Sequence, residues 1–345
     1  MSGEPVRVGV VGLGVGRRHL EVFANHPDCV VVAVADRLEE ARAGVRDEHP
    51  DVALVASWDD LLTHDLDAVA IASHDDDHAR QVVDALEAGL HVFCEKPLCR
   101  TEVEVGEVRE AAASRPEAVV ASNLVLRAAP LWRRLRGEIA SGALGTVYAI
   151  DADYLYGRLH KITDGWRGEV DGYSVMLGGG VHMVDLVMGL LDEPPVGVAA
   201  AGTDLATRGT GFAENDFSAA TFRFPSGAVG RVTANFACVH RHQHVVRVFG
   251  TDGTVVVDDL GARRYSERDP GSAAEWLPDD ALAAHKGALI APFVDAVLGH
   301  DHDLPGLGHE LSVIEACLAA DRAAASGEVA AIPQAIAGGI DPCRR

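Results

Sequence analysis

A glycine-rich turn between two apolar stretches constrains the fold of this chain more than any other feature. Residues 6–11 are mostly apolar, as in a buried strand, and they lead directly into Gly12-Leu13-Gly14-Val15-Gly16. A second apolar stretch, 29–35, ends at Asp36. A tight glycine turn lets backbone amides at a helix N-terminus approach a pyrophosphate, and an acidic residue about 20 positions later accepts ribose hydroxyls. This order of residues predicts a dinucleotide-binding βαβ unit.

The spacing of the glycines departs from the common G-x-G-x-x-G pattern. Gly12 and Gly14 fit it, but Gly16 comes one residue early and Arg17 stands at the usual third position. Glycine turns also follow strands for steric reasons alone, so the motif depends on its surroundings. Here the preceding strand, the amphipathic helical pattern after the turn and the acidic strand end all agree. We therefore predict cofactor contacts from Gly12, Gly14, Val15 and Gly16.

The residue at the end of the second apolar stretch indicates which dinucleotide binds. The charge of Asp36 would repel a 2′-phosphate, which favours NAD over NADP. Arg37, beside it, could still accommodate that phosphate, so NADP is the alternative. Both residues belong to the predicted cofactor site.

Length, composition and charge limit the class of protein. A chain of 345 residues exceeds the usual size of one hydrophobic core, which predicts two domains. No apolar stretch approaches the ~20 residues that span a bilayer, and the first residues do not resemble an export signal, so we expect a cytoplasmic protein. A formal net charge of −22 disfavours nucleic acid and anionic membranes as partners. The six scattered cysteines predict neither a disulfide framework nor a thiolate zinc site.

The order of strand and helix patterns predicts an α/β fold with two different halves. Strands and helices alternate up to Asn123, which is typical of a doubly wound parallel sheet. Long strand patterns follow, with the hairpin turns Pro225-Ser226-Gly227 and Thr251-Asp252-Gly253, which favour an open, mostly antiparallel sheet. The predicted domains are a dinucleotide-binding Rossmann domain over 1–123, a substrate-binding and oligomerisation domain over 124–334, and a tail over 335–345.

Several short motifs follow one another in a characteristic order. Glu95-Lys96-Pro97 comes after an apolar stretch that ends at Cys94. The later motifs are Asn123 and Arg127 with Pro130, the segments 142–145 and 180–185, and 324–327 before Pro333. Together with the glycine turn, they resemble the glucose-fructose oxidoreductase and inositol dehydrogenase (Gfo/Idh/MocA) family. The resemblance covers nearly the whole chain, although no single motif would establish it.

The resemblance implies an activity as well as a fold. Members have an N-terminal NAD(P) domain, a C-terminal α/β domain and a substrate cleft between them. They typically transfer hydride between nicotinamide and a secondary alcohol or ketone of a sugar, a nucleotide sugar or a cyclitol. Many are dimers or tetramers built on the open sheet. Two alternatives on the same fold are an NAD-dependent glycoside-cleaving enzyme and a non-catalytic NAD or sugar sensor.

The resemblance also assigns two catalytic residues. The family lysine maps onto Lys96, which would orient the substrate oxygen and share its proton at the carboxyl edge of the sheet. Glu95 and Lys96 are also predicted cofactor contacts, and Pro97 follows a cis peptide in many members. The family histidine maps onto His182, whose unperturbed pKa near ~6.5 suits proton transfer. A packing role on an apolar helix is the alternative for His182.

One position departs from the family pattern. Sugar and inositol dehydrogenases of this family often carry an aspartate four residues before the histidine, where this chain has Gly178. Either the lysine and histidine work without that partner, or Tyr173 or Asp185 takes its place, or the reaction differs. The predicted substrate-binding residues are Arg127, Asp185 and Tyr173. A packing role is the alternative for the tyrosine.

Two histidine-rich segments have several interpretations. The segment 73–78 follows the fourth strand, where family members approach the nicotinamide, so we predict cofactor contacts from Ser73, His74 and His78. Histidines at 240, 242 and 244 would share one face of a continuous strand, which could hold a transition metal. A solvent-exposed sheet edge or a contact between subunits would also account for these histidines, and we predict no metal site.

Overall fold

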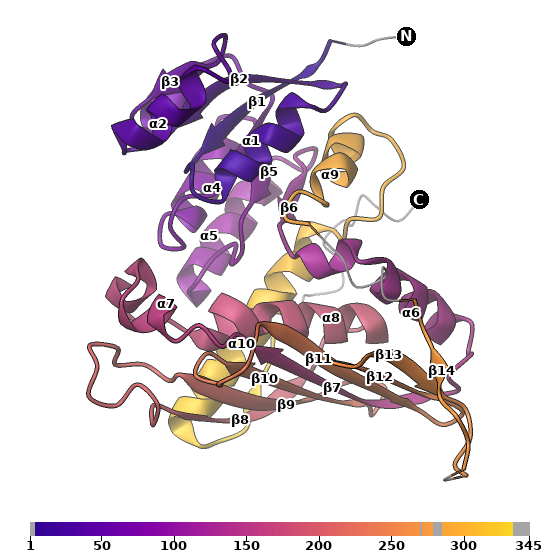
Figure 1. Ribbon diagram of the computed structural model, residues 1–345. Helices are drawn as coiled ribbons and strands as arrows, with labels where there is room; N and C mark the ends of the chain where they lie inside the picture. Colours follow the sequence, from indigo (N-terminus) through magenta and orange to yellow (C-terminus); the bar gives the residue numbers. More distant parts are fainter. Residues whose placement is uncertain (1–3, 270, 279–284, 334–345) are drawn as a thin grey trace. The chain divides into compact units, whose positions relative to one another are not determined.

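The computed structural model describes residues 4–269, 271–278 and 285–333 (Figure 1). Contacts divide the chain into two compact units. Among the described residues, 4–125 and 285–311 form the first unit, and 126–269, 271–278 and 312–333 form the second. The predicted tail, 335–345, lies outside the described residues. Within those residues, no helix combines the length and apolar character needed to cross a membrane.

The first unit contains a six-stranded sheet in the order β3-β2-β1-β4-β5-β6. All its strand pairs are parallel. The strands are β1 (Val6–Val11), β2 (Cys29–Ala35), β3 (Ala53–Val55), β4 (Ala68–Ile71), β5 (His91–Cys94) and β6 (Val120–Ser122). The strand order reverses between β1 and β4, as in dinucleotide-binding sheets. The predicted doubly wound parallel sheet is confirmed.

Helices connect these strands. They are α1 (Gly16–Ala24), α2 (Glu39–Arg46), α3 (Trp58–Leu61), α4 (His78–Glu87) and α5 (Glu102–Ala113). The start of α5 shows how local sequence sets a boundary. The Thr101 side chain accepts a hydrogen bond from the Glu104 amide, and the Glu104 carboxylate accepts one from the Thr101 amide. This reciprocal pair is a capping box.

A late segment of the chain also belongs to the first unit. Helix α9 (Ile290–Val297) packs against α1 and β5. The ring of Phe293 lies 5.5 Å from that of Phe93 and 6.4 Å from that of Phe23, between centroids, in the core of this unit. The contacts therefore group 285–311 with the first unit, whereas the predicted boundary at 123 placed this segment in the second domain.

The glycine turn joins β1 to α1 without room for side chains at two positions. Gly12 has a φ of +82°, and a Cβ on it would lie 2.3 Å from the Ala72 carbonyl oxygen. Gly16 is the first residue of α1, and a Cβ there would lie 3.0 Å from the Ala72 Cβ. The third glycine, although early, allows α1 to approach the sheet closely, which is its usual purpose.

The second unit contains a nine-stranded sheet in the order β14-β13-β12-β11-β7-β10-β9-β8-β15. Its strands are β7 (Val147–Leu155), β8 (Gly197–Thr203), β9 (Phe217–Arg223), β10 (Val229–Asn235), β11 (Gln243–Gly250), β12 (Thr254–Asp258), β13 (Gly261–Tyr265), β14 (Glu275–Trp276) and β15 (Ala330–Ala331). Among the described strands of this sheet, only β7 and β10 run parallel to one another, and the other pairs are antiparallel. The predicted open, mostly antiparallel sheet is confirmed.

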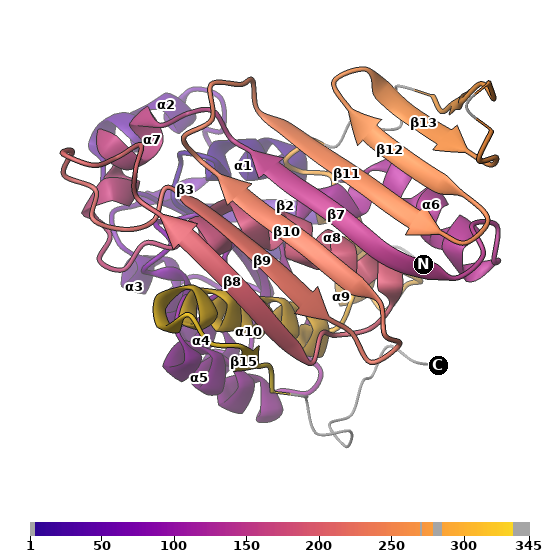
Figure 2. The same ribbon diagram turned by 90° about the horizontal axis from the view of Figure 1, so that it is seen from below.

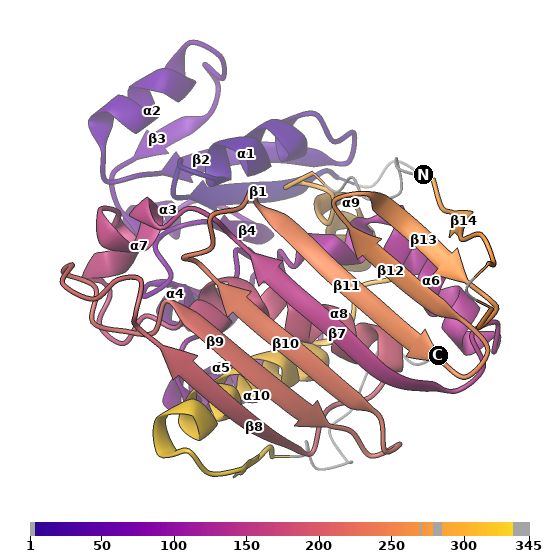
Figure 3. The ribbon, with the colours of Figure 1, turned by 60° about the horizontal axis from the view of Figure 1, so that its bottom comes forward.

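Helices cover one face of this second sheet. Figures 2 and 3 show the strands in front and helices α6, α8 and α10 behind them. The helical segments are η1 (Val125–Ala128), α6 (Pro130–Ala140), α7 (His160–Thr163), η2 (Trp166–Glu169), the π-helix η3 (Met176–Gly180), α8 (Val181–Leu191) and α10 (Leu307–Ser326). Along β7, alternate residues Ile150, Ala152 and Tyr154 are buried toward the helices.

The other face of this sheet carries charges. Arg231 Nε lies 3.1 Å from Asp151 Oδ1, and Arg231 Nη1 lies 3.1 Å from Asp153 Oδ1. Thr233 Oγ1 donates to Asp153 Oδ1 at 2.8 Å. The alternation of strand residues therefore gives this sheet one apolar, helix-covered face and one polar face.

Alanine substitutions should distinguish a glycine that leaves no room for a side chain, Gly12, from one beside open space, Gly14. Gly12→Ala is expected to lower the free energy of unfolding by about 2–4 kcal/mol, because it combines a positive φ with a backbone clash. Gly14→Ala should change it by less than about 0.5 kcal/mol, because no atom lies within 4 Å of its Cβ position. Urea denaturation of both variants measures the difference, and equal losses would contradict this account of the turn.

Candidate functional site

The first predicted contacts gather at the glycine turn. Asp36 follows β2, and its Oδ2 accepts from the Leu13 amide at 2.7 Å while its Oδ1 accepts from the Leu38 amide at 2.8 Å. These two bonds aim the carboxylate at the turn and leave lone pairs for further donors such as ribose hydroxyls. Gly14 is exposed and has open space beside it. Arg37 is exposed next to the carboxylate.

The segment after β4 combines accessible and buried residues. Ser73 and His74 are half-buried, and Ser73 Oγ donates to Gln81 Oε1 at 2.7 Å. His78 is 0% exposed, with Nδ1 2.7 Å from the Pro97 carbonyl and Nε2 3.3 Å from the Ser73 carbonyl. Both ring nitrogens of His78 therefore face backbone carbonyls, and a cofactor contact from this residue stays a prediction that concerns its backbone. His78 ties the loop after β4 to the loop after β5.

The loop after β5 carries the predicted catalytic lysine. Lys96 is half-buried and follows β5 by two residues, at the carboxyl edge of the parallel sheet. The Lys96–Pro97 peptide is cis, as the resemblance implied. The hydrogen bond between His78 and the Pro97 carbonyl fixes the far side of this turn.

A buried polar network holds Glu95, next to this lysine. Asn123 Nδ2 donates to Glu95 Oε1 at 2.7 Å and to the Lys286 carbonyl at 2.9 Å. His19 Nε2 lies 3.2 Å from the same carboxylate oxygen, and both His19 and Asn123 are buried. Burial alone would raise the pKa of Glu95, but the His19 hydrogen bond and charge, with help from Lys96 and Asn123, lower it to about 2.

His19 is a contributor that the sequence alone did not identify. It lies on the buried face of α1, one turn after Gly16, where it also packs edge-on against Phe93. A histidine on an otherwise apolar helix face was the available signal. Its partner, Glu95, is remote in the sequence, so only the fold shows what the ring does.

In the second unit, Arg127 and Asp185 are directed at one another. Arg127 Nε lies 3.0 and 2.9 Å from the two carboxylate oxygens, and Nη2 lies 2.6 Å from Asp185 Oδ1. Both side chains are buried. The pair joins η1 to α8 in a bidentate geometry, which suits a fixed support more than direct contact with a substrate.

The ring of Tyr173 occupies the space beside Gly178, four residues before His182. A Cβ on Gly178 would lie 2.1 Å from the Tyr173 hydroxyl oxygen. Tyr173 is 3% exposed, so its phenol fills the space that a residue-178 side chain would need. His182 is the second residue of α8, one turn further along. The structure therefore places Tyr173, rather than an aspartate, at this position beside the helix.

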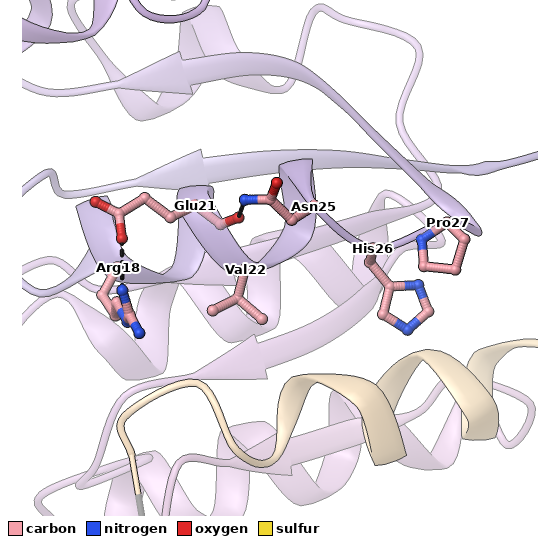
Figure 4. Close-up of a pocket in the computed structure, with 6 residues that line it drawn as sticks. All are labelled: Arg18, Glu21, Val22, Asn25, His26 and Pro27. Carbon is pink, nitrogen blue, oxygen red and sulfur yellow. Dashed lines mark hydrogen bonds and ion pairs between the residues drawn. The ribbon is translucent and has the colours of Figure 1, made fainter.

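A pocket of about 490 Å³ lies elsewhere in the first unit, along the C-terminal part of α1 (Figure 4). Its lining residues are Arg18, Glu21, Val22, Asn25, His26 and Pro27. Arg18 and Glu21 form an ion pair at 2.8 Å on its wall. None of the predicted site residues lines this pocket, so it is separate from the glycine turn and the lysine loop.

Replacing Glu95 by Gln should weaken the fold in a pH-dependent way. A folded-state pKa near 2, below the usual 4.5, stabilises the protein fully above about pH 4.5 and loses this effect as the pH falls toward 2. Glu95→Gln is expected to lower the free energy of unfolding by about 1–3 kcal/mol at pH 7. Urea titrations at pH 7, 5 and 4 measure the difference in free energy of unfolding between the unmodified protein and the variant. This difference should become smaller only below pH 5. A difference that grows below pH 5 would contradict a lowered pKa for Glu95.

Two models of known protein families match this chain. The model of the oxidoreductase family with an NAD-binding Rossmann fold matches residues 6–122. The GFO/IDH/MocA C-terminal domain model matches residues 132–256. Between them, the two models span most of the chain.

The chain is also similar to individual proteins of known name. The chain is 28% identical to the D-glucoside 3-dehydrogenase of Escherichia coli, over 72% of this chain and 75% of the relative. It is also 28% identical to the inositol 2-dehydrogenase of Rubrobacter xylanophilus, over 83% and 80%. The crystal structure of GenD2 from gentamicin A biosynthesis, in complex with NAD, superposes with a TM-score of 0.81 at 25% identity, covering 97% and 98% of the two chains. The chain therefore belongs to the Gfo/Idh/MocA family of NAD-binding oxidoreductases.

Proposed function

We propose that this protein is an NAD-dependent dehydrogenase or reductase of a sugar, a nucleotide sugar or a cyclitol. One observation carries the proposal, namely the order of groups along the carboxyl edge of the first sheet. Asp36 follows β2, the glycine turn follows β1, and Lys96 follows β5. A dinucleotide across this edge would bind its adenosine near Asp36, its pyrophosphate at the turn and its nicotinamide near Lys96.

The residues at this edge fit the cofactor. Gly14 leaves open space for a pyrophosphate, and the fixed Asp36 carboxylate suits two ribose hydroxyls. That carboxylate would repel a 2′-phosphate, which favours NAD, while the exposed Arg37 keeps NADP as the alternative. Val15, Gly16, Ser73, His74 and Glu95 complete the proposed cofactor contacts. When bound, the nicotinamide accepts or donates the hydride.

Lys96 handles the oxygen of the reacting carbon in this proposal. Its ammonium orients the carbinol or carbonyl oxygen and holds a proton there while the bond order at carbon changes. The neighbouring Glu95 is kept ionised by His19, Lys96 and Asn123, so a fixed carboxylate adjoins the lysine in the sequence. His182 is proposed as a second proton-transfer group, and its imidazole chemistry suits that task.

Three further residues shape the substrate site in this proposal. Tyr173 offers its hydroxyl beside the helix that carries His182, in place of the family aspartate. Arg127 and Asp185 act as a pair that anchors η1 on α8, so they support the wall of the site. The names of the relatives, which include glucoside and inositol dehydrogenases, support a polyhydroxylated ring as substrate.

We also propose a cytoplasmic homo-oligomer, a dimer or tetramer, assembled through the polar face of the second sheet. No described helix covers that face (Figure 2), and its ion-paired side chains stay partly exposed, so a second copy has access to them. Arg231→Glu would leave that face with three carboxylates together, so it should shift the assembly toward monomer in light scattering. An unchanged mass in this variant would argue against this face as the interface.

Substitution of the lysine tests the proposed activity. The purified protein should bind NADH and reduce NAD with at least one of myo-inositol, methyl β-D-glucoside or a nucleotide sugar, or reduce 1,5-anhydro-D-fructose with NADH. Lys96→Ala is expected to lower kcat by at least about 100-fold. Its NADH affinity should stay within about threefold, because the turn and Asp36 are untouched.

Lys161→Ala is the matched control, because this exposed lysine lies on α7 and has no proposed role. It should turn over like the unmodified protein. Full activity in Lys96→Ala would remove the proposed role of the lysine, and absence of NADH and NADPH binding would remove the cofactor assignment.

A further inference from the structure

Three histidines that alternate in the sequence separate in the structure. His240 turns to the surface, where its Nε2 lies 2.9 Å from Asp259 Oδ2. His242 and His244 stay together, with ring centroids 5.0 Å apart. Among the described residues, no group of three or more histidine, cysteine, aspartate or glutamate side chains is arranged to hold a metal. Of the three, His244 is the one with a buried ring nitrogen that has no hydrogen-bond partner among the described residues, whereas His242 is exposed.

We propose that His244 is a specificity-determining residue that hydrogen-bonds a substrate hydroxyl next to the carbon that His182 serves. The proposal rests on the proposed function, because it assumes a polyhydroxylated substrate at His182. The ring centroids of His182 and His244 are 6.3 Å apart. Both rings lie against Tyr154, at 6.1 and 5.5 Å between centroids.

Strand pairing explains why His244 reaches this position. His244 on β11 is directly opposite Tyr154 on β7, so both side chains lie on the same face of the sheet. Tyr154 is buried on the helix-covered face, where α8 begins with Val181 and His182. A one-residue shift of β11 would send His244 to the polar face instead.

A glycine brings the helical segment close to these rings. A Cβ on Gly179 would lie 2.3 Å from Tyr154 Cε1 and 2.8 Å from Phe236 Cε2. Only a residue without a side chain permits this approach of the π-helix to the aromatic wall. The wall that supports His182 and His244 is therefore closely packed, as a recognition site requires.

His244 is equipped to read a hydroxyl. Burial lowers the pKa of His244 to about 4, and the neighbouring His242 adds to the effect. At neutral pH the ring is therefore uncharged, with one N–H donor and one nitrogen acceptor. Its Nε2 is buried and has no hydrogen-bond partner among the residues that the structure describes. A hydroxyl, which both donates and accepts, would satisfy that nitrogen.

Deoxy analogues test the proposal in the NAD-bound enzyme. The probes are myo-inositol, methyl β-D-glucoside and their monodeoxy analogues. The unmodified enzyme should prefer the parent over one analogue by at least about tenfold in kcat/KM. His244→Phe should reduce that preference to less than about threefold, and His244→Gln should keep part of it. NADH affinity should be unchanged in both variants.

His240→Phe is the matched control, because this histidine precedes the same strand but pairs with Asp259 at the surface. It should keep the full preference. Retention of that preference in His244→Phe overturns the proposal. If His244→Phe does not fold, nitrogen NMR of histidine-labelled enzyme with NADH decides, since saturation with the better probe must move the His244 Nε2 signal. An unmoved signal overturns the proposal as well. If the unmodified enzyme turns over no probe, the proposed substrate class fails and this proposal fails with it.

Discussion

A backbone contact without space for a side chain organises the first unit. Gly12 lies against the Ala72 carbonyl, and Gly16 brings the first turn of α1 against the same residue. Because Ala72 follows β4, this contact fixes the N-terminus of α1 where the strand order reverses. The turn then has Asp36 on one side, after β2, and Lys96 on the other, after β5. The spacing of the proposed cofactor-binding groups thus follows from the strand order and from the absence of side chains at Gly12 and Gly16.

In both units, charged side chains that are largely shielded from solvent are paired with other groups of the protein. Glu95 is ionised because His19 and Asn123 offset the unfavourable effect of burial, and its fixed charge lies next to Lys96. In the second unit, Arg127 and Asp185 neutralise each other between η1 and α8. Removing one partner of such a pair leaves an uncompensated buried charge, which is costly. These residues are therefore fixed in position by their charged and hydrogen-bonded partners.

Local sequence patterns were sufficient to predict the helices and strands, but they did not predict several contacts between residues that are remote in the sequence. The glycine turn, the alternation up to Asn123 and the hairpin turns predicted both sheets correctly. The return of 285–311 to the first unit depends on Phe293 meeting Phe93, a contact that no local pattern contains. The bond of His78 to the Pro97 carbonyl joins two loops that are 19 residues apart in the sequence, so no local pattern contains it. The proximity of His244 to His182 likewise required the register of β11 on β7 and the glycine approach at 179.

The absence of side chains at Gly178 and Gly179, before α8, affects both the packing and the charge of this region. At 178 the absent side chain is replaced in space by the phenol of Tyr173, and at 179 by the ring of Tyr154. An aspartate at 178 would place a negative charge beside this helix and would stabilise a protonated imidazole. A phenol is neutral at pH 7 and can still donate and accept a proton in a hydrogen bond. Two of the rings near His182 are those of Tyr154 and His244, at 6.1 and 6.3 Å between centroids, and both can form hydrogen bonds while uncharged.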